Sequence, residues 1–218
     1  LGNIFSGFEN TLPVTMDEII YHTKAVARGV NRSLLVSDLP FLSYQVSLEE
    51  AKRNAGLLIK NGANAVKIEV NPSQIEIVKA IVDMGIPVMG HIGFTPQQVY
   101  QLGGYKVQGK TDEAQERLIQ LALDLERVGC FSLVLELMPK ELAKRITDAL
   151  YIPTISCGAG VYCSGQVLVT QDLLGITQGK KLKFVKSYIN LYEKISQVIT
   201  EYKSEVNQGI FPDDDHSF

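Results

Sequence analysis

The feature that most constrains the fold of this chain is a regular alternation of helical segments with short apolar segments. The apolar segments have the length of strands and lack a period-two polar pattern, so we expect strands that are buried on both faces. Buried strands joined by helices are typical of a parallel α/β sheet. The expected strands are 33–37, 63–70, 87–92, 131–137 and 152–157, with a further candidate at 165–169. The expected helices begin near residues 15, 47, 71, 111 and 139, and an amphipathic helical segment runs from 183.

Two ways of closing such a sheet compete, an open doubly wound sheet and a (β/α)8 TIM barrel. No Gly-x-Gly-x-x-Gly follows the first expected strand, so the dinucleotide-binding form lacks its fingerprint. About six strands are fewer than a complete barrel needs, and the chain opens at Leu1 on a loop and a helix. We therefore expect a single α/β domain over 1–218, a (β/α)8 barrel whose N-terminal βα units are missing from the sequence given, with C-terminal helices from about 183.

Charge and composition exclude several kinds of partner. The net charge is −3, with 21 Lys and Arg against 24 Asp and Glu, so we expect no nucleic-acid partner and no anionic membrane surface. No segment approaches the roughly 20 apolar residues of a spanning helix. Three cysteines do not suggest a disulfide framework, and they favour a reducing compartment, the cytoplasm.

Polar and ionisable side chains stand at the ends of five successive expected strands. In a parallel barrel the carboxyl ends of the strands form one rim, and catalytic groups gather there. Residues two apart in a strand share a face, so Lys67 and Glu69 point the same way. The groups expected at this rim are Asp38, Lys67, Glu69, His91, Glu136 and the segment 156–158.

Each of these residues also has a purely structural interpretation. Asp38 precedes Leu39-Pro40 and could bond turn amides. Lys67 and Glu69 could form a mutual ion pair, although buried charges are costly in a barrel interior. An isolated His91 is more often a satisfied core histidine than a catalytic group. Glu136 lies in an almost wholly apolar run. A carboxylate there either pairs with a cation or has its pKa raised toward the range useful for a general base.

The types of residue at the rim favour one kind of chemistry. Aspartate and glutamate without clustered histidines or cysteines suit a hard cation, above all Mg²⁺. Such an ion can chelate a 2-oxo acid and stabilise the enolate that forms on proton loss. Lys67 would add positive charge beside that oxyanion, and Glu136 on a separate strand would remove the proton. The residues thus predict metal-assisted carbanion chemistry next to a carbonyl.

Seven ordered motifs resemble the ketopantoate hydroxymethyltransferase (3-methyl-2-oxobutanoate hydroxymethyltransferase) family over essentially the whole chain. They are 11–15 (TLPVT), 21–23 (YHT), 38–41 (DLPF), 66–69 (VKIE), 90–97 (GHIGFTPQ), 102–109 (LGGYKVQG) and 216–218 (HSF). The resemblance implies a (β/α)8 barrel of the phosphoenolpyruvate mutase/isocitrate lyase type. It also implies transfer of a hydroxymethyl group from 5,10-methylenetetrahydrofolate to 3-methyl-2-oxobutanoate, which gives 2-dehydropantoate in pantothenate synthesis.

Matching motifs carry the family's site residues onto this chain. Asp38 would be a ligand of Mg²⁺ and contact the oxo acid, Glu69 would be a metal ligand directly or through water, and Lys67 would bind substrate. Glu136 would be the base that takes the C3 proton, and His91 is similar to an active-site histidine that contacts substrate. The resemblance further implies a homo-oligomer, a homodecamer of two pentameric rings.

The chain departs from the family pattern at its start. The family has a Gly-Asp-Ser stretch directly before the Leu-Gly that begins this sequence, and the Asp and Ser of that stretch belong to the site. The simplest expectation is that the natural protein has those residues ahead of Leu1.

Two alternatives stay open. One is another metal-dependent 2-oxo acid lyase or aldolase of the same superfamily; against it, residues 103–106 (GGYK) stand where such lyases commonly carry a cysteine loop. The other is a non-catalytic barrel remnant that acts as a binding or assembly module.

Overall fold

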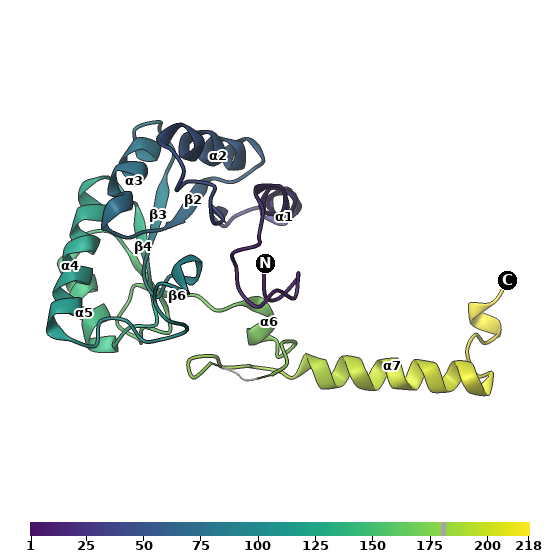
Figure 1. Cartoon of the computed structure of the whole chain (residues 1–218). Coiled ribbons are helices and arrows are strands. Elements are labelled where there is room, and N and C mark those ends of the chain that lie inside the picture. The colour runs from purple at the N-terminus through teal and green to yellow at the C-terminus, as the bar shows by residue number, and fades with distance from the viewer. Residues whose placement is uncertain (180–181) are drawn as a thin grey trace. The chain divides into compact units, whose positions relative to one another are not determined.

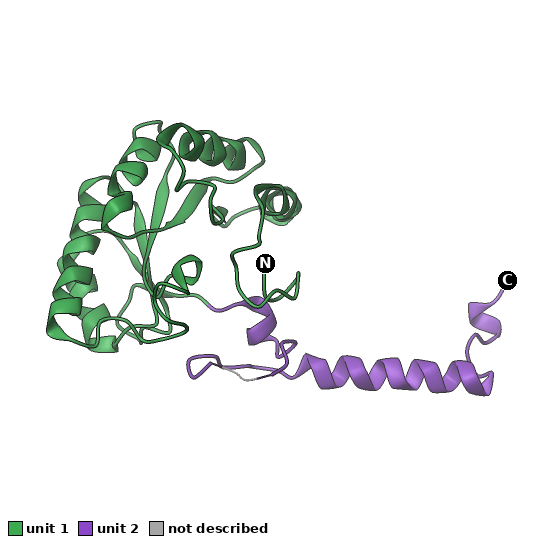
Figure 2. Ribbon diagram, viewed as in Figure 1, with its two compact units in different colours: residues 1–167 green, residues 168–218 purple. Residues whose placement is uncertain are grey.

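The computed structural model describes residues 1–179 and 182–218, which form two compact units, 1–167 and 168–218 (Figure 2). The first unit is an α/β unit that alternates strands and helices along the chain (Figure 1). Its elements are α1 (Met16–Gly29), β1 (Val36–Asp38), α2 (Leu48–Lys60), β2 (Ala65–Glu69), α3 (Ile75–Val82), β3 (Val88–Gly93), α4 (Asp112–Arg127), β4 (Ser132–Glu136), α5 (Lys140–Ala149), β5 (Thr154–Cys157) and β6 (Gly165–Gln166). Short 3₁₀ turns lie at Pro72–Gln74 and Pro96–Gln98.

All six strands are parallel and stand in the order in which they occur in the chain, β1 to β6. This order is that of a barrel wall, whereas a doubly wound sheet changes direction partway along the strand order. Within the described residues β1 and β6 each pair with one neighbour, so the sheet is an open part of a barrel. The predicted parallel α/β barrel type is confirmed.

The core of this unit lies between the sheet and its helices. One side of each central strand packs against α2 to α5, and the residues there, such as Ile68, Leu133 and Leu135, are fully buried. The other side faces inward and includes Lys67 and Glu69, at the alternate positions of β2. Apart from these charged residues, the inward face carries apolar side chains such as Met89 and Val134, which explains why the strands read as nearly continuous apolar runs.

Several predicted boundaries need correction. The first strand lies at Val36–Asp38 rather than 33–37: its register with β2 begins at Val36, and the Leu35 N–H bonds to the Asn64 side chain. The sixth strand is only Gly165–Gln166. The capping box of Thr15 and Glu18 at the start of α1 is present as expected.

The second unit contains α6 (Thr170–Leu173), α7 (Leu191–Gln208) and a 3₁₀ turn at Asp214–His216. The predicted helix from 183 instead begins at Leu191, because the Asn190 side chain caps that point by accepting from the Glu193 N–H. None of the helices in the described ranges is long and apolar enough to cross a membrane. The expectation of a single domain over 1–218 concerns how the two units fold together and stays a prediction.

Candidate active site

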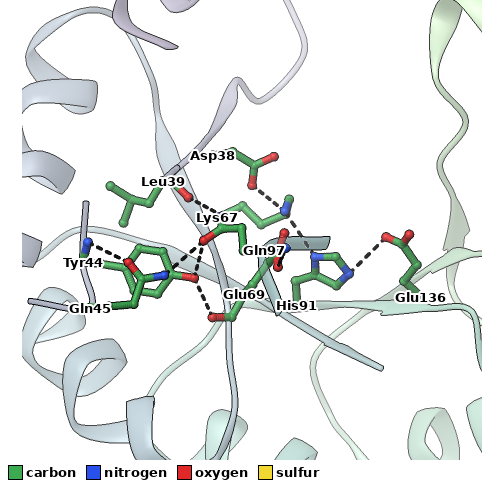
Figure 3. A network of polar contacts seen from close by, with 9 residues as sticks. All are labelled: Asp38, Leu39, Tyr44, Gln45, Lys67, Glu69, His91, Gln97 and Glu136. Carbon is green, nitrogen blue, oxygen red and sulfur yellow. Dashed lines mark hydrogen bonds and ion pairs between the residues drawn. The ribbon is translucent and has the colours of Figure 1, made fainter. Parts of the chain in front are cut away.

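The register of the sheet gathers the strand-end residues on the inward face. Asp38 of β1 stands opposite Lys67 of β2, and Glu69 of β2 stands opposite His91 of β3. Glu136 of β4 stands opposite Gly93, two positions beyond His91 along β3. Because residues two apart share a face, all five side chains converge at the carboxyl ends of the strands (Figure 3). The predicted rim is present.

Lys67 forms its ion pair with Asp38 rather than with Glu69. Burial alone lowers the pKa of the Lys67 ammonium, but the carboxylates of Asp38, Glu69 and Glu136 outweigh it and raise that pKa above its ordinary value. Lys67 therefore carries its charge throughout the physiological pH range. The Nζ atom also lies 3.4 Å from Nδ1 of His91, which places the cation in the middle of the site.

Glu69 is almost fully buried, with 5% of its surface exposed. Its Oε2 atom accepts a hydrogen bond from the Gln97 main-chain N–H at 2.8 Å. Burial raises the pKa of the Glu69 carboxyl, and the opposing effects of His91, Lys67 and the Gln97 N–H do not cancel it. The positive charge around the Glu69 carboxylate therefore does not offset the cost of burying it.

This raised pKa predicts that Glu69→Gln stabilises the metal-free protein at neutral pH. A carboxyl whose pKa is higher in the folded state than in the unfolded state costs stability as the pH rises through the folded-state value. In chelator at pH 7.5 we expect a higher Tm for Glu69→Gln than for the natural sequence, by circular dichroism. Below about pH 4 both states hold the proton and the difference disappears. An unchanged or lower Tm at pH 7.5 would contradict the assignment of burial as the cause.

His91 is 2% exposed and lies between Lys67 and Glu136. Its Nε2 atom is 3.1 Å from Oε2 of Glu136, an ion-pair distance, yet the ring does not aim an N–H at that oxygen. Nε2 thus has no hydrogen-bond partner among the described residues. A buried polar atom left in this state is unlike a satisfied core histidine and indicates a place for a ligand atom.

Gly93 allows the chain to turn tightly beside Glu136. Its φ of 96° lies in the left-handed region, and a Cβ there would come within 2.3 Å of the Glu136 carbonyl oxygen. The turn lets the Phe94 N–H donate to that carbonyl at 2.8 Å. The Glu136 main chain is therefore fixed to the loop that follows β3.

The rim borders a cavity of about 650 Å³ on the inward face of the sheet. Ionisable residues occupy its rim, and apolar side chains such as Met89, Val134 and Ile155 line the rest. The cavity residues with titratable side chains are Asp38, Lys67, Glu69, His91, Glu136 and Cys157. Small-molecule sites have this mixture of apolar wall and a few convergent polar groups.

Three residues near the rim were not predicted to belong to it. Tyr44 is fully buried and its hydroxyl lies 3.0 Å from the Glu69 main-chain carbonyl. Gln97 contacts both Glu69 and Leu39. Tyr105 stacks on Phe94 with ring centroids 4.8 Å apart, and burial, then Glu136 and Glu69, raise its pKa. Tyr44 and Tyr105 come from loops and Gln97 from a 3₁₀ turn, where periodicity carries no signal; only their place in or near the quoted motifs pointed to them.

The donor atoms at the rim fit a hard divalent cation. Three carboxylates face one lysine there, which leaves an excess of negative charge. The described residues contain no cluster of three or more His, Cys, Asp or Glu able to hold a metal by themselves. Mg²⁺ does not need one, because it commonly takes one or two carboxylates and completes its shell with water and substrate oxygens. Asp38 and Glu69 meet that requirement.

Solved structures share this fold at low sequence identity. A 2,3-dimethylmalate lyase of the phosphoenolpyruvate mutase/isocitrate lyase superfamily matches 100% of this chain and 76% of its own, with a TM-score of 0.56 and 13% identity. A phosphoenolpyruvate phosphomutase from Streptomyces platensis subsp. rosaceus matches 94% of this chain and 72% of its own, with a TM-score of 0.57 and 13% identity. The protein therefore has the α/β-barrel fold of that superfamily.

The sequence identifies the family within this fold. The family model described as ketopantoate hydroxymethyltransferase matches residues 1–214. Proteins named 3-methyl-2-oxobutanoate hydroxymethyltransferase are 54% identical in Thermoanaerobacter sp. (strain X514) and 52% identical in Thermotoga maritima, over 100% of this chain and 80% and 81% of theirs. The chain belongs to the ketopantoate hydroxymethyltransferase family, and it is a transferase.

Proposed function

We propose that the protein transfers the one-carbon unit of 5,10-methylenetetrahydrofolate to 3-methyl-2-oxobutanoate as a hydroxymethyl group, with water supplying the hydroxyl oxygen, giving 2-dehydropantoate and tetrahydrofolate. The observation that carries the chemistry is the convergence of Glu136, His91 and Lys67 on one cavity beside the carboxylates of Asp38 and Glu69. Family membership supports the reaction as a step of pantothenate biosynthesis. Incubating the protein with both substrates and following 2-dehydropantoate by mass spectrometry tests the proposal.

Glu136 is the base that removes the C3 proton of the oxo acid. Its side chain is 17% exposed, so the carboxylate reaches the cavity while little water surrounds it. Its Oε2 atom lies 3.1 Å from Nε2 of His91, so the base adjoins the histidine that contacts substrate. A positioned base of this kind contributes about 10²–10⁴-fold to a proton abstraction.

Lys67 and His91 hold the substrate. The charged Lys67 ammonium, between Asp38 and His91, faces the negative charge that develops on the keto oxygen when C3 loses its proton. His91 Nε2, which has no hydrogen-bond partner in the described part of the chain, is available to a substrate oxygen. Both groups therefore act where charge appears during the reaction.

Asp38 and Glu69 would hold Mg²⁺. When bound, the ion would polarise the keto group and stabilise the enolate. Asp38 is half exposed and opens toward the cavity, so it also reaches the substrate, whereas Glu69 is buried and fixed by Gln97. The folate donor would approach the enolate through the same cavity. The homodecamer and the cytoplasmic location stay predictions.

Asp38→Ala is expected to weaken the metal requirement selectively. Removing one of two carboxylates should raise the Mg²⁺ concentration for half-maximal proton exchange by at least about tenfold. The measurement is a Mg²⁺ titration of exchange of the C3 proton in D₂O. The exposed Asp83→Ala serves as control, because Asp83 pairs with Lys79 on α3. An Asp38→Ala titration that superimposes on the natural one would remove Asp38 as a ligand.

A further inference from the structure

Gln97 joins the ends of two strands that carry the proposed cation ligands. It is the middle residue of the 3₁₀ turn Pro96–Gln98, which follows β3, and its main-chain N–H donates to Glu69 Oε2 at 2.8 Å. Its side-chain Nε2 donates to the Leu39 carbonyl at 2.8 Å. Leu39 is fully buried and directly follows Asp38 (Figure 3). One residue therefore touches the carboxylate at the end of β2 and the main chain at the end of β1.

The other end of the Gln97 amide closes a small network. Oε1 accepts from the Tyr44 hydroxyl at 2.9 Å and from Gln45 Nε2 at 3.2 Å. The same Tyr44 hydroxyl lies 3.0 Å from the Glu69 main-chain carbonyl, so its one proton is shared between two acceptors. Gln97 thus bonds directly to the Glu69 carboxylate and lies beside the hydroxyl that contacts the Glu69 main chain. A buried network with several members resists rotation of any single one.

The chemistry of this position requires an amide. Its donor end faces a carbonyl, and its acceptor end faces a hydroxyl and a second amide. Glutamate would keep the acceptor but could not donate to Leu39, and methionine, of similar length, offers neither function. The main-chain bond to Glu69 survives either change. Substitution of the side chain therefore tests the part of the network that fixes the strand ends.

We propose that Gln97 is a positioning residue that sets the relative placement of Asp38 and Glu69 for binding a divalent cation. The inference rests on the proposed function, in which these two carboxylates hold Mg²⁺. A network that only attached the loop to the sheet would affect stability and not affinity for the cation. Substitution of residues that hydrogen-bond to metal ligands typically weakens metal binding by about 10–100-fold.

The test is Mg²⁺ binding by isothermal titration calorimetry to the purified protein and to Gln97→Met. We expect the Kd for Mg²⁺ to rise about tenfold in Gln97→Met. Gln98→Met is the matched control, because Gln98 lies on the same turn and its amide oxygen contacts Asn71 at 3.5 Å instead of the strand ends. Its Kd should stay within about twofold. Tm values in chelator are recorded for each variant.

Tyr44→Phe removes the hydroxyl while keeping the buried ring, and it should raise the Kd for Mg²⁺ in the same direction. If Gln97→Met does not fold, the Kd of Tyr44→Phe for Mg²⁺ tests the positioning role in its place. A lowered Tm with an unchanged Kd in the folded variants would overturn the positioning role alone. Failure of the natural protein to bind Mg²⁺ would overturn the proposed metal site and this inference together.

Discussion

Glu136→Gln is expected to abolish exchange of the C3 proton of 3-methyl-2-oxobutanoate, with a loss of about 10³-fold or more in rate. Glutamine has nearly the same shape but cannot accept the proton. Glu136 lies at the end of β4, held through its carbonyl by the Phe94 N–H, so the strand should keep its place. The measurement is loss of the C3 proton signal by NMR in D₂O with Mg²⁺ present.

The control for this variant is Glu141→Gln, on the exposed first turn of α5. It should exchange at the rate of the natural protein. A Tm of Glu136→Gln close to that of the natural protein would show that the fold is intact. Exchange at an unchanged rate in a folded Glu136→Gln would remove this residue as the base.

Lys67→Met should lower the exchange rate by about 10²–10³-fold, because it removes the only lysine at the cavity rim among the described residues. The expected pattern differs from that of Asp38→Ala. Losing an ammonium makes the rim more negative, so Mg²⁺ should bind at least as tightly while the substrate KM rises. Calorimetry for Mg²⁺ and substrate titrations of the exchange rate measure the two effects separately.

Lys79→Met provides the comparison for Lys67→Met, since Lys79 pairs with Asp83 on an exposed helix face. Lys67→Met should also lower the Tm, because Glu69 loses a neighbouring positive charge while remaining buried. If Lys67→Met leaves both KM and rate unchanged, the lysine does not contact the developing oxyanion.

Much of the fold could be predicted from the sequence because buried parallel strands have a strong local signature. Runs such as 131–137 are mostly apolar and of strand length, and residues such as Thr15 mark helix starts with side chains that cap them. The bounds of short edge strands are harder to predict from the sequence. β1 and β6 have two or three paired residues each, and their limits depend on neighbours such as Asn64 rather than on their own sequence.

The rim could be predicted because the carboxyl ends of parallel strands meet at one edge of the sheet. The residues that this rule places there are Asp38, Lys67, Glu69, His91 and Glu136. The pairing among these side chains could not be predicted. The register of β1 and β2 places Lys67 beside Asp38 on the neighbouring strand, and parallel strands are joined by long connections that do not fix that register locally. Gln97 reaches Glu69 and Leu39 across 28 and 58 residues of chain, a relation that no local pattern encodes.

We expect this rim to form an enolate from the oxo acid independently of the one-carbon donor. The most direct measurement is exchange of the C3 proton by the natural protein in D₂O without folate, at a series of Mg²⁺ concentrations. We expect exchange that saturates with Mg²⁺ and stops in chelator. Formation of 2-dehydropantoate when 5,10-methylenetetrahydrofolate is added, with no exchange in its absence at any Mg²⁺ concentration, would contradict enolate formation without the donor.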